Sequence, residues 1–121
     1  MVVAGLAVAG ALGAPVRYIL DGYVQDRIEG VFPLGTFVVN VSGSFLLGLL
    51  AGFALYHAFP ATPKTILGTG FCGAYTTFST FTYETVRLAE ERAVGAALQN
   101  ALLSVVVPAL AAAAGLALAA L

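Results

Sequence analysis

Six residues with a polar or aromatic side chain inside long apolar segments could together line a path for a small solute. They are Asn40, Phe78, Ser79, Thr80, Phe81 and Ser104. The amide and the hydroxyls supply neutral N–H and O–H donors, and the edge of a phenyl ring carries a positive partial charge. No Lys and no ring of carboxylates accompanies them in these segments. The set therefore predicts a small anion, held by neutral groups and released again, rather than a divalent cation.

The remaining residues do not predict an enzyme or a nucleic-acid-binding protein. The chain has one Cys and one His, so it can form neither a multi-thiolate metal site nor a histidine cluster. It has no paired carboxylates and no Ser/His/Asp set, and Cys72, which lies among glycines, is expected to be a small core residue. With five Lys and Arg against six Asp and Glu, the chain also lacks the basic surface of a nucleic-acid binder.

Composition places these residues in a membrane protein. The 121 residues are 60% hydrophobic and 9% charged, whereas about 25% of the residues in a soluble domain are charged. Four apolar stretches reach the length of about 20 residues that a spanning helix needs. They cover residues 2–20, 32–59, 65–86 and 93–121, and short connections join them. We therefore expect one all-α membrane domain of four spanning helices, in which neighbouring helices are antiparallel.

The second stretch carries a stripe of small and polar residues. Thr36, Asn40, Ser44, Gly48 and Gly52 recur every four residues, so they lie on one side of a helix. Ser44, Gly48 and Gly52 predict a close contact with another helix. Asn40 differs, because an amide in the middle of a span is costly to leave unpaired. It must face a partner group or a wet path.

The third stretch is expected to break near its middle. Gly68, Gly70 and Gly73 precede a run of hydroxyl and aromatic residues, and this composition is unfavourable for a continuous helix. A break at membrane depth exposes backbone groups, and it is tolerated only where they are buried in protein or line a water or ion site. The alternative is a kink that packs on another helix and is held by hydroxyl bonds to the backbone.

Three segments resemble the signature segments of the Fluc (CrcB-like) fluoride channels. They are GAPVRY at residues 13–18, GTFVVNVSGSFLLG at 35–48, and GFCGAYTTFSTF at 70–81 with Glu84 beyond it. The resemblance follows the first three predicted helices in order and fits the whole length. It implies a passive, fluoride-selective channel that exports fluoride across the plasma membrane and so protects the cell. It also implies an antiparallel, dual-topology homodimer with two pores between subunits inserted in opposite orientations.

The resemblance assigns roles to particular residues. Asn40 is similar to the pore asparagine of the family, and Phe78 and Phe81 to the phenylalanines that line the path. The other implied pathway residues are the hydroxyl track of Ser79, Thr80 and Ser104, its polar end at Thr36 and Glu84, and the vestibule arginine Arg17.

The resemblance also implies a structural sodium ion on the two-fold axis of the dimer. Its ligands would be the backbone carbonyls of Gly73 and Thr76 from both subunits. The sequence departs from the family in the fourth stretch, where many relatives have an aromatic hydroxyl about four residues before the serine. This chain has Asn100 instead.

Two other readings and the orientation remain open at this point. A small multidrug or cation exporter also has four spans and dual topology, but it needs a carboxylate deep in the first span, and residues 2–20 hold none. A purely structural membrane subunit would not predict the polar stripe. On the side of the membrane that holds the first and third connections, the positively charged residues are Arg17, Arg27, Arg87 and Arg92. The other side has only Lys64. This contrast gives only a weak orientation signal, because Arg17 and Arg87 lie at or within helix ends.

Overall fold

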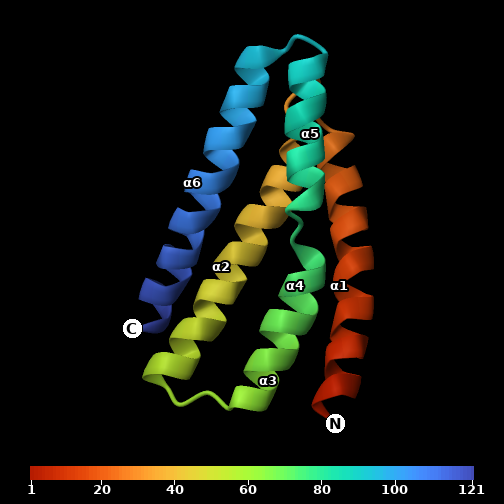
Figure 1. The fold of residues 1–121 in the computed structure, drawn as a ribbon. Coiled ribbons are helices and arrows are strands. Elements are labelled where there is room, and N and C mark those ends of the chain that lie inside the picture. Colours follow the sequence, from red (N-terminus) through yellow and green to blue (C-terminus); the bar gives the residue numbers. More distant parts are fainter.

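The computed structural model describes residues 1–121 and is entirely helical. The three long helices are α1 (Val2–Gln25), α2 (Leu34–Tyr56) and α6 (Val94–Ala119). Between α2 and α6 the chain forms α3 (Ala61–Thr65), the π-helix η1 (Ile66–Cys72), α4 (Gly73–Tyr75) and α5 (Ser79–Glu90). The helices run side by side, with both termini and the α2–α3 connection at one end and the other two connections at the opposite end (Figure 1).

The three long helices are each long and apolar enough to cross a membrane. They contain 24, 23 and 26 residues, and at about 1.5 Å per residue each exceeds the roughly 30 Å of a bilayer's hydrocarbon core. Many of their large apolar side chains are exposed, including those of Leu12, Ile19 and Leu110. Such a surface suits lipid, and the prediction of an all-helical, multi-pass membrane protein is confirmed. The first helix continues beyond Leu20 to Gln25.

The segment predicted as the third span follows a less regular course. η1 and α4 bring the chain to Tyr75, Thr76 takes an extended conformation with φ −81° and ψ 160°, and α5 begins at Ser79. η1 packs closely on α1, since a Cβ added at Gly70 would lie 2.9 Å from the Cβ of Ala9. The glycines of this segment therefore permit a close helix contact as well as an irregular backbone.

Gly48 and Gly52 bring α2 against α6. A Cβ at Gly48 would collide with the carbonyl oxygen of Ala112, and one at Gly52 would lie 2.5 Å from the Cβ of Ala119. The close contact predicted for these two glycines is confirmed. Ser44, which was expected to join them, instead lines a cavity beside this contact. The segment from α3 through η1 and α4 to α5 thus lies between α1 on one side and the α2–α6 pair on the other (Figure 1).

Candidate ion pathway

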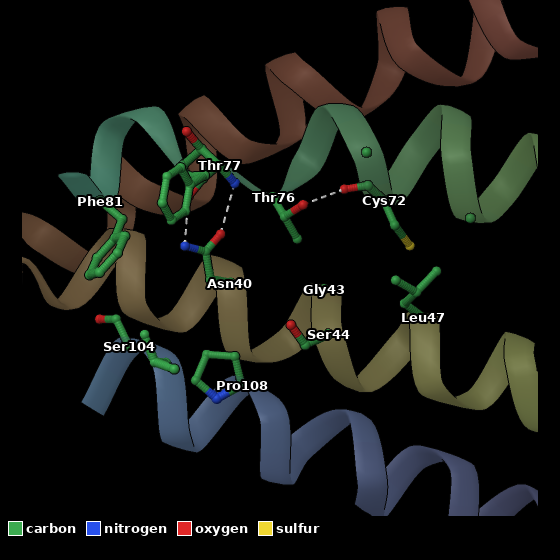
Figure 2. Close-up of a pocket in the computed structure, with 14 residues that line it drawn as sticks. Asn40, Gly43, Ser44, Leu47, Cys72, Thr76, Thr77, Phe81, Ser104 and Pro108 are labelled. Atoms are coloured by element: carbon green, nitrogen blue, oxygen red, sulfur yellow. Dashed lines mark hydrogen bonds between the residues drawn. The ribbon is translucent and has the colours of Figure 1, made fainter. Parts of the chain in front are cut away.

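A cavity of about 300 Å³ lies between α2, α6 and the chain around the α4–α5 junction. Figure 2 shows Asn40 and Ser44 reaching it from α2, Ser104 and Pro108 from α6, and Phe81 from α5. The predicted site residues on its lining are Asn40, Gly73, Thr76, Phe78, Phe81 and Ser104. No charged side chain lines this cavity. The fold therefore brings together the amide, both rings and one hydroxyl of the predicted track from three separate parts of the chain.

The amide of Asn40 is paired with the backbone of Thr77. Its Nδ2 donates to the Thr77 carbonyl oxygen at 2.8 Å, and the Thr77 N–H donates to Oδ1 at 2.8 Å (Figure 2). Asn40 thus has a partner group, which was one of the two alternatives for it, and its side chain also lines the cavity. One N–H of the amide is left over, because an Asn side chain carries two.

Two backbone carbonyls at the junction lack their usual helical donors. In an α-helix the N–H of Thr77 would bond the Gly73 carbonyl, and that of Thr80 would bond the Thr76 carbonyl. Here the Thr77 N–H donates to Asn40 Oδ1, and the Thr80 N–H donates to Thr77 Oγ1 at 3.1 Å. The Thr76 hydroxyl donates to the Cys72 carbonyl at 2.8 Å. The carbonyls of Gly73 and Thr76 are therefore left without the N–H groups that a continuous helix would give them.

Phe78 and Phe81 form a pair at the same cavity. Their ring centroids are 5.7 Å apart with an interplanar angle of 55°, so the two rings pack against each other. Their environments differ, because Phe81 is 9% exposed and Phe78 is 75% exposed. Phe78 is thus a large aromatic side chain that the rest of the chain leaves uncovered.

A second cavity, of about 150 Å³, lies towards the end of the molecule where α1 meets α2. Arg17, Thr36 and Thr80 line it together with Asp21. The buried Thr36 hydroxyl donates to Glu84 Oε1 at 3.0 Å, and the other oxygen of Glu84 is buried without a hydrogen-bond partner. The structure thus joins Thr36 to Glu84, the two residues that the resemblance placed at the polar end of the path.

The three hydroxyls predicted to form one track are separated in the structure. Ser104 lines the first cavity and Thr80 the second. Ser79 is exposed and lines neither, with its Oγ 3.4 Å from Thr77 Oγ1. Thr77 lines both cavities, and it was not singled out from the sequence. Its only signal there was membership of the hydroxyl run that follows the glycines.

Comparisons with known proteins identify the family to which this chain belongs. The family model described as "CrcB-like protein, Camphor Resistance (CrcB)" matches residues 4–116. The chain is 54% identical over 98 residues to a protein of Leifsonia xyli subsp. xyli named "Fluoride-specific ion channel FluC 1", with 81% of this chain and 72% of that protein covered. It is 52% identical over 101 residues to a Streptomyces avermitilis protein of the same name, with 83% and 82% covered. It is 50% identical over 102 residues to "Fluoride-specific ion channel FluC 2" of Mycolicibacterium paratuberculosis, with 84% and 80% covered. Since the family model matches nearly the whole chain and these relatives align over most of their own length, this protein belongs to the CrcB-like family.

Proposed function

We propose that this protein is a subunit of a passive, fluoride-selective ion channel that exports fluoride across the plasma membrane and protects the cell from it. The observation that carries the proposal is the convergence of Asn40, Phe78, Phe81 and Ser104 on one uncharged cavity. Membership of the CrcB-like family and the names of the relatives support the same substrate.

The lining fits the chemistry of fluoride. This ion is small, strongly hydrated and a strong hydrogen-bond acceptor, so fixed N–H, O–H and aromatic C–H groups can replace its water. Chloride is larger and accepts hydrogen bonds less strongly, so the same groups compensate less well for the water that chloride loses. The first cavity holds no positive side chain that would trap an anion, and Arg17 lies in the second cavity, where it can attract one. No energy source is needed for such a path.

The proposal includes an antiparallel homodimer surrounded by lipid. Phe78 is 75% exposed in the single subunit, and Gly73 and Ser79 beside it are also exposed. A second copy inserted in the opposite orientation would cover this surface and complete the lining. A two-fold axis in the membrane plane would then create two equivalent paths. In this arrangement each subunit spans the membrane four times, with the third span broken between α4 and α5.

The residues at the junction also suit a structural sodium ion. The carbonyls of Gly73 and Thr76 lack helical N–H donors, as described above, and oxygen ligands of this kind suit a hard cation. A Cβ added at Gly73 would contact nothing within 4 Å, so this position is open towards a partner subunit. A bound sodium ion would supply positive charge that compensates carbonyl oxygens at membrane depth.

Ion efflux from liposomes tests the proposed function. Purified protein is reconstituted into vesicles loaded with fluoride or with chloride, and a potassium ionophore removes the charge imbalance. We expect rapid fluoride release without any proton gradient or nucleotide, and chloride release no faster than from protein-free vesicles. Similar release of both anions would contradict the proposal. Export of organic cations driven by protons would instead favour a small multidrug exporter.

A further inference from the structure

A chain of hydrogen bonds ties α6 to α5 behind the first cavity. The Asn100 side chain, 1% exposed, donates through Nδ2 to Thr85 Oγ1 at 2.7 Å. Thr85 Oγ1 donates to the Phe81 carbonyl oxygen at 2.8 Å. At the other end of the amide, the Ser104 hydroxyl donates to Asn100 Oδ1 at 2.9 Å.

The carbonyl oxygen of Phe81, at the end of this series of hydrogen bonds, determines the direction of each bond in it. A carbonyl oxygen can only accept, so the single hydroxyl proton of Thr85 must point at Phe81. The Thr85 oxygen is then the acceptor for Asn100, which places the amide nitrogen towards Thr85 and the amide oxygen towards Ser104. The only proton of Ser104 is therefore committed to Asn100.

This direction decides what Ser104 offers to an ion. Ser104 lines the same cavity as Asn40 and Phe81, and it lies beside Phe81 at one end of that cavity (Figure 2). With its proton held by Asn100, the Ser104 hydroxyl presents oxygen lone pairs to the cavity. To donate to an anion it must turn away and leave Asn100 Oδ1 buried without a partner, which is unfavourable.

We infer that Asn100 is a positioning residue that withholds the Ser104 proton and so weakens anion binding at this end of the cavity. The inference rests on the proposed function, that fluoride passes through this cavity. Conduction requires binding strong enough for entry and weak enough for exit. Asn100 shifts this balance towards exit, because every fluoride ion that takes the Ser104 proton must first break the Ser104–Asn100 bond.

The substitution Asn100→Leu tests the inference, because it removes the amide acceptor while keeping a side chain of similar size. Fluoride efflux is measured as a function of internal fluoride concentration, and the half-saturating concentration is compared with that of the unmodified protein. Loss of one net hydrogen bond predicts that this concentration falls about fivefold. Gln99→Leu is the matched control, since Gln99 is the exposed neighbour on the same helix, and it should leave the value unchanged.

Two further variants separate this role from a purely structural one. Thr85→Val keeps Asn100 but removes the oxygen that orients its amide, so the amide nitrogen can turn to Ser104 and free the serine proton. It should lower the half-saturating concentration as Asn100→Leu does. In a Ser104→Ala background, Asn100→Leu should have no further effect, because no proton remains to be released.

The inference is overturned if Asn100→Leu shifts the half-saturating concentration equally with and without Ser104. It is also overturned if Asn100→Leu and Thr85→Val both leave the value unchanged. Should Asn100→Leu fail to assemble, Thr85→Val decides alone. An unmodified protein that releases no fluoride overturns the proposed function together with this inference, whereas normal release with unchanged variants overturns the inference only.

Discussion

The polar side chains of the candidate pathway are already hydrogen-bonded within the subunit. Asn40 pairs with the backbone of Thr77, Thr36 donates to Glu84, and Ser104 donates to Asn100. An anion that takes the hydroxyl proton of Thr36 or Ser104 must compete with the internal partner of that hydroxyl, whereas one N–H of Asn40 is free. A strong acceptor such as fluoride competes better than chloride does. In the proposed channel these internal bonds would add to selectivity, because they penalise the weaker acceptor.

At Asn40 this view predicts a large effect of an almost isosteric change. Asn40→Asp replaces an N–H donor by an oxygen that faces the Thr77 carbonyl, which lies 2.8 Å from Nδ2, and it adds a negative charge beside the anion path. We expect fluoride efflux to fall about tenfold or more, as the loss of a hydrogen bond to a buried acceptor and the added repulsion imply. The measurement is efflux from vesicles with equal amounts of correctly assembled protein.

Gln99→Glu is the control for Asn40→Asp, since it makes the same amide-to-carboxylate change at an exposed position outside the cavities. It should leave efflux unchanged. Undiminished efflux through Asn40→Asp would remove Asn40 from the pathway.

At this scale the sequence predicted several residue types and positions but not their partners. The cost of an unpaired amide identified Asn40, and the resemblance pointed to Phe78, Phe81 and Ser104, all of which line one cavity. The Asn40–Thr77 pairing joins groups 37 residues apart, so it depends on how α2 meets the α4–α5 junction. No local pattern reveals such a contact, and Thr77 was overlooked for that reason.

At the scale of elements, side chains keep the chain between α4 and α5 out of a helical pattern. Asn40 Oδ1 takes the N–H of Thr77, and Thr77 Oγ1 takes the N–H of Thr80. Both acceptors compete with the backbone carbonyls that would otherwise continue the helix. The irregular backbone is thus stabilised by specific partners, and not only by low helix propensity.

Thr77→Val tests the link between this irregularity and the proposed sodium ion. Valine removes the acceptor for the Thr80 N–H, which can then return to the Thr76 carbonyl and compete with a cation there. Because a bound ligand stabilises the folded state, we expect the unmodified protein to melt at a higher temperature in sodium than in N-methylglucamine. Thr77→Val should lose most of this difference, and Thr77→Ser, which keeps the hydroxyl, should retain it. An equal sodium effect in Thr77→Val and Thr77→Ser would contradict the account.

The α2–α6 contact gives a prediction about stability. A Cβ at Gly48 would collide with the Ala112 carbonyl, so Gly48→Ala should destabilise the protein by about 1–3 kcal/mol, the usual cost of overpacking. Gly95→Ala on α6 is the matched control, because a Cβ there meets nothing within 4 Å. It should be neutral or slightly stabilising. Thermal unfolding in detergent measures both, and a Gly48→Ala variant as stable as Gly95→Ala would contradict the close packing.

The long helices were more predictable than the short ones. Uninterrupted apolar runs predicted α1, α2 and α6, because a segment in lipid must satisfy its own backbone. The π-helix η1 was not foreseen, although Gly68 and Gly70 lie within it. Its geometry depends on the close packing of Gly70 against Ala9 and Leu6 of α1, and a contact between distant segments leaves no periodic signal in the sequence.

At the scale of the whole molecule, the positive charges are compatible with insertion in both orientations. Arg17 lines the second cavity, and Arg87 lies within α5 at 3.7 Å from Glu91. Neither belongs to a free connection, where the positive-inside rule acts most strongly. Without these two residues, one side of the membrane has Arg27 and Arg92 in its connections and the other side has Lys64. A difference of one positive charge favours one orientation only weakly.

The antiparallel dimer predicts labelling from both sides of the membrane. Single cysteines are placed at the exposed residues Asp26 or Glu91, in a variant with Cys72→Ala. These residues directly follow α1 and α5, whose C-terminal ends lie at the same end of the molecule (Figure 1). An impermeant thiol reagent should label about half of the protein from each face, as two subunits of opposite orientation require. Labelling from one face only would exclude the antiparallel dimer and the shared pathway derived from it.

The most direct test of the central claim is the reversal potential of the current through purified protein in a planar bilayer, with fluoride on one side and chloride on the other. A passive fluoride channel predicts a current that needs no energy source and reverses far from zero, on the side set by the fluoride gradient. A reversal potential near zero, or one set by chloride, would contradict fluoride selectivity, and the absence of any current would contradict a channel.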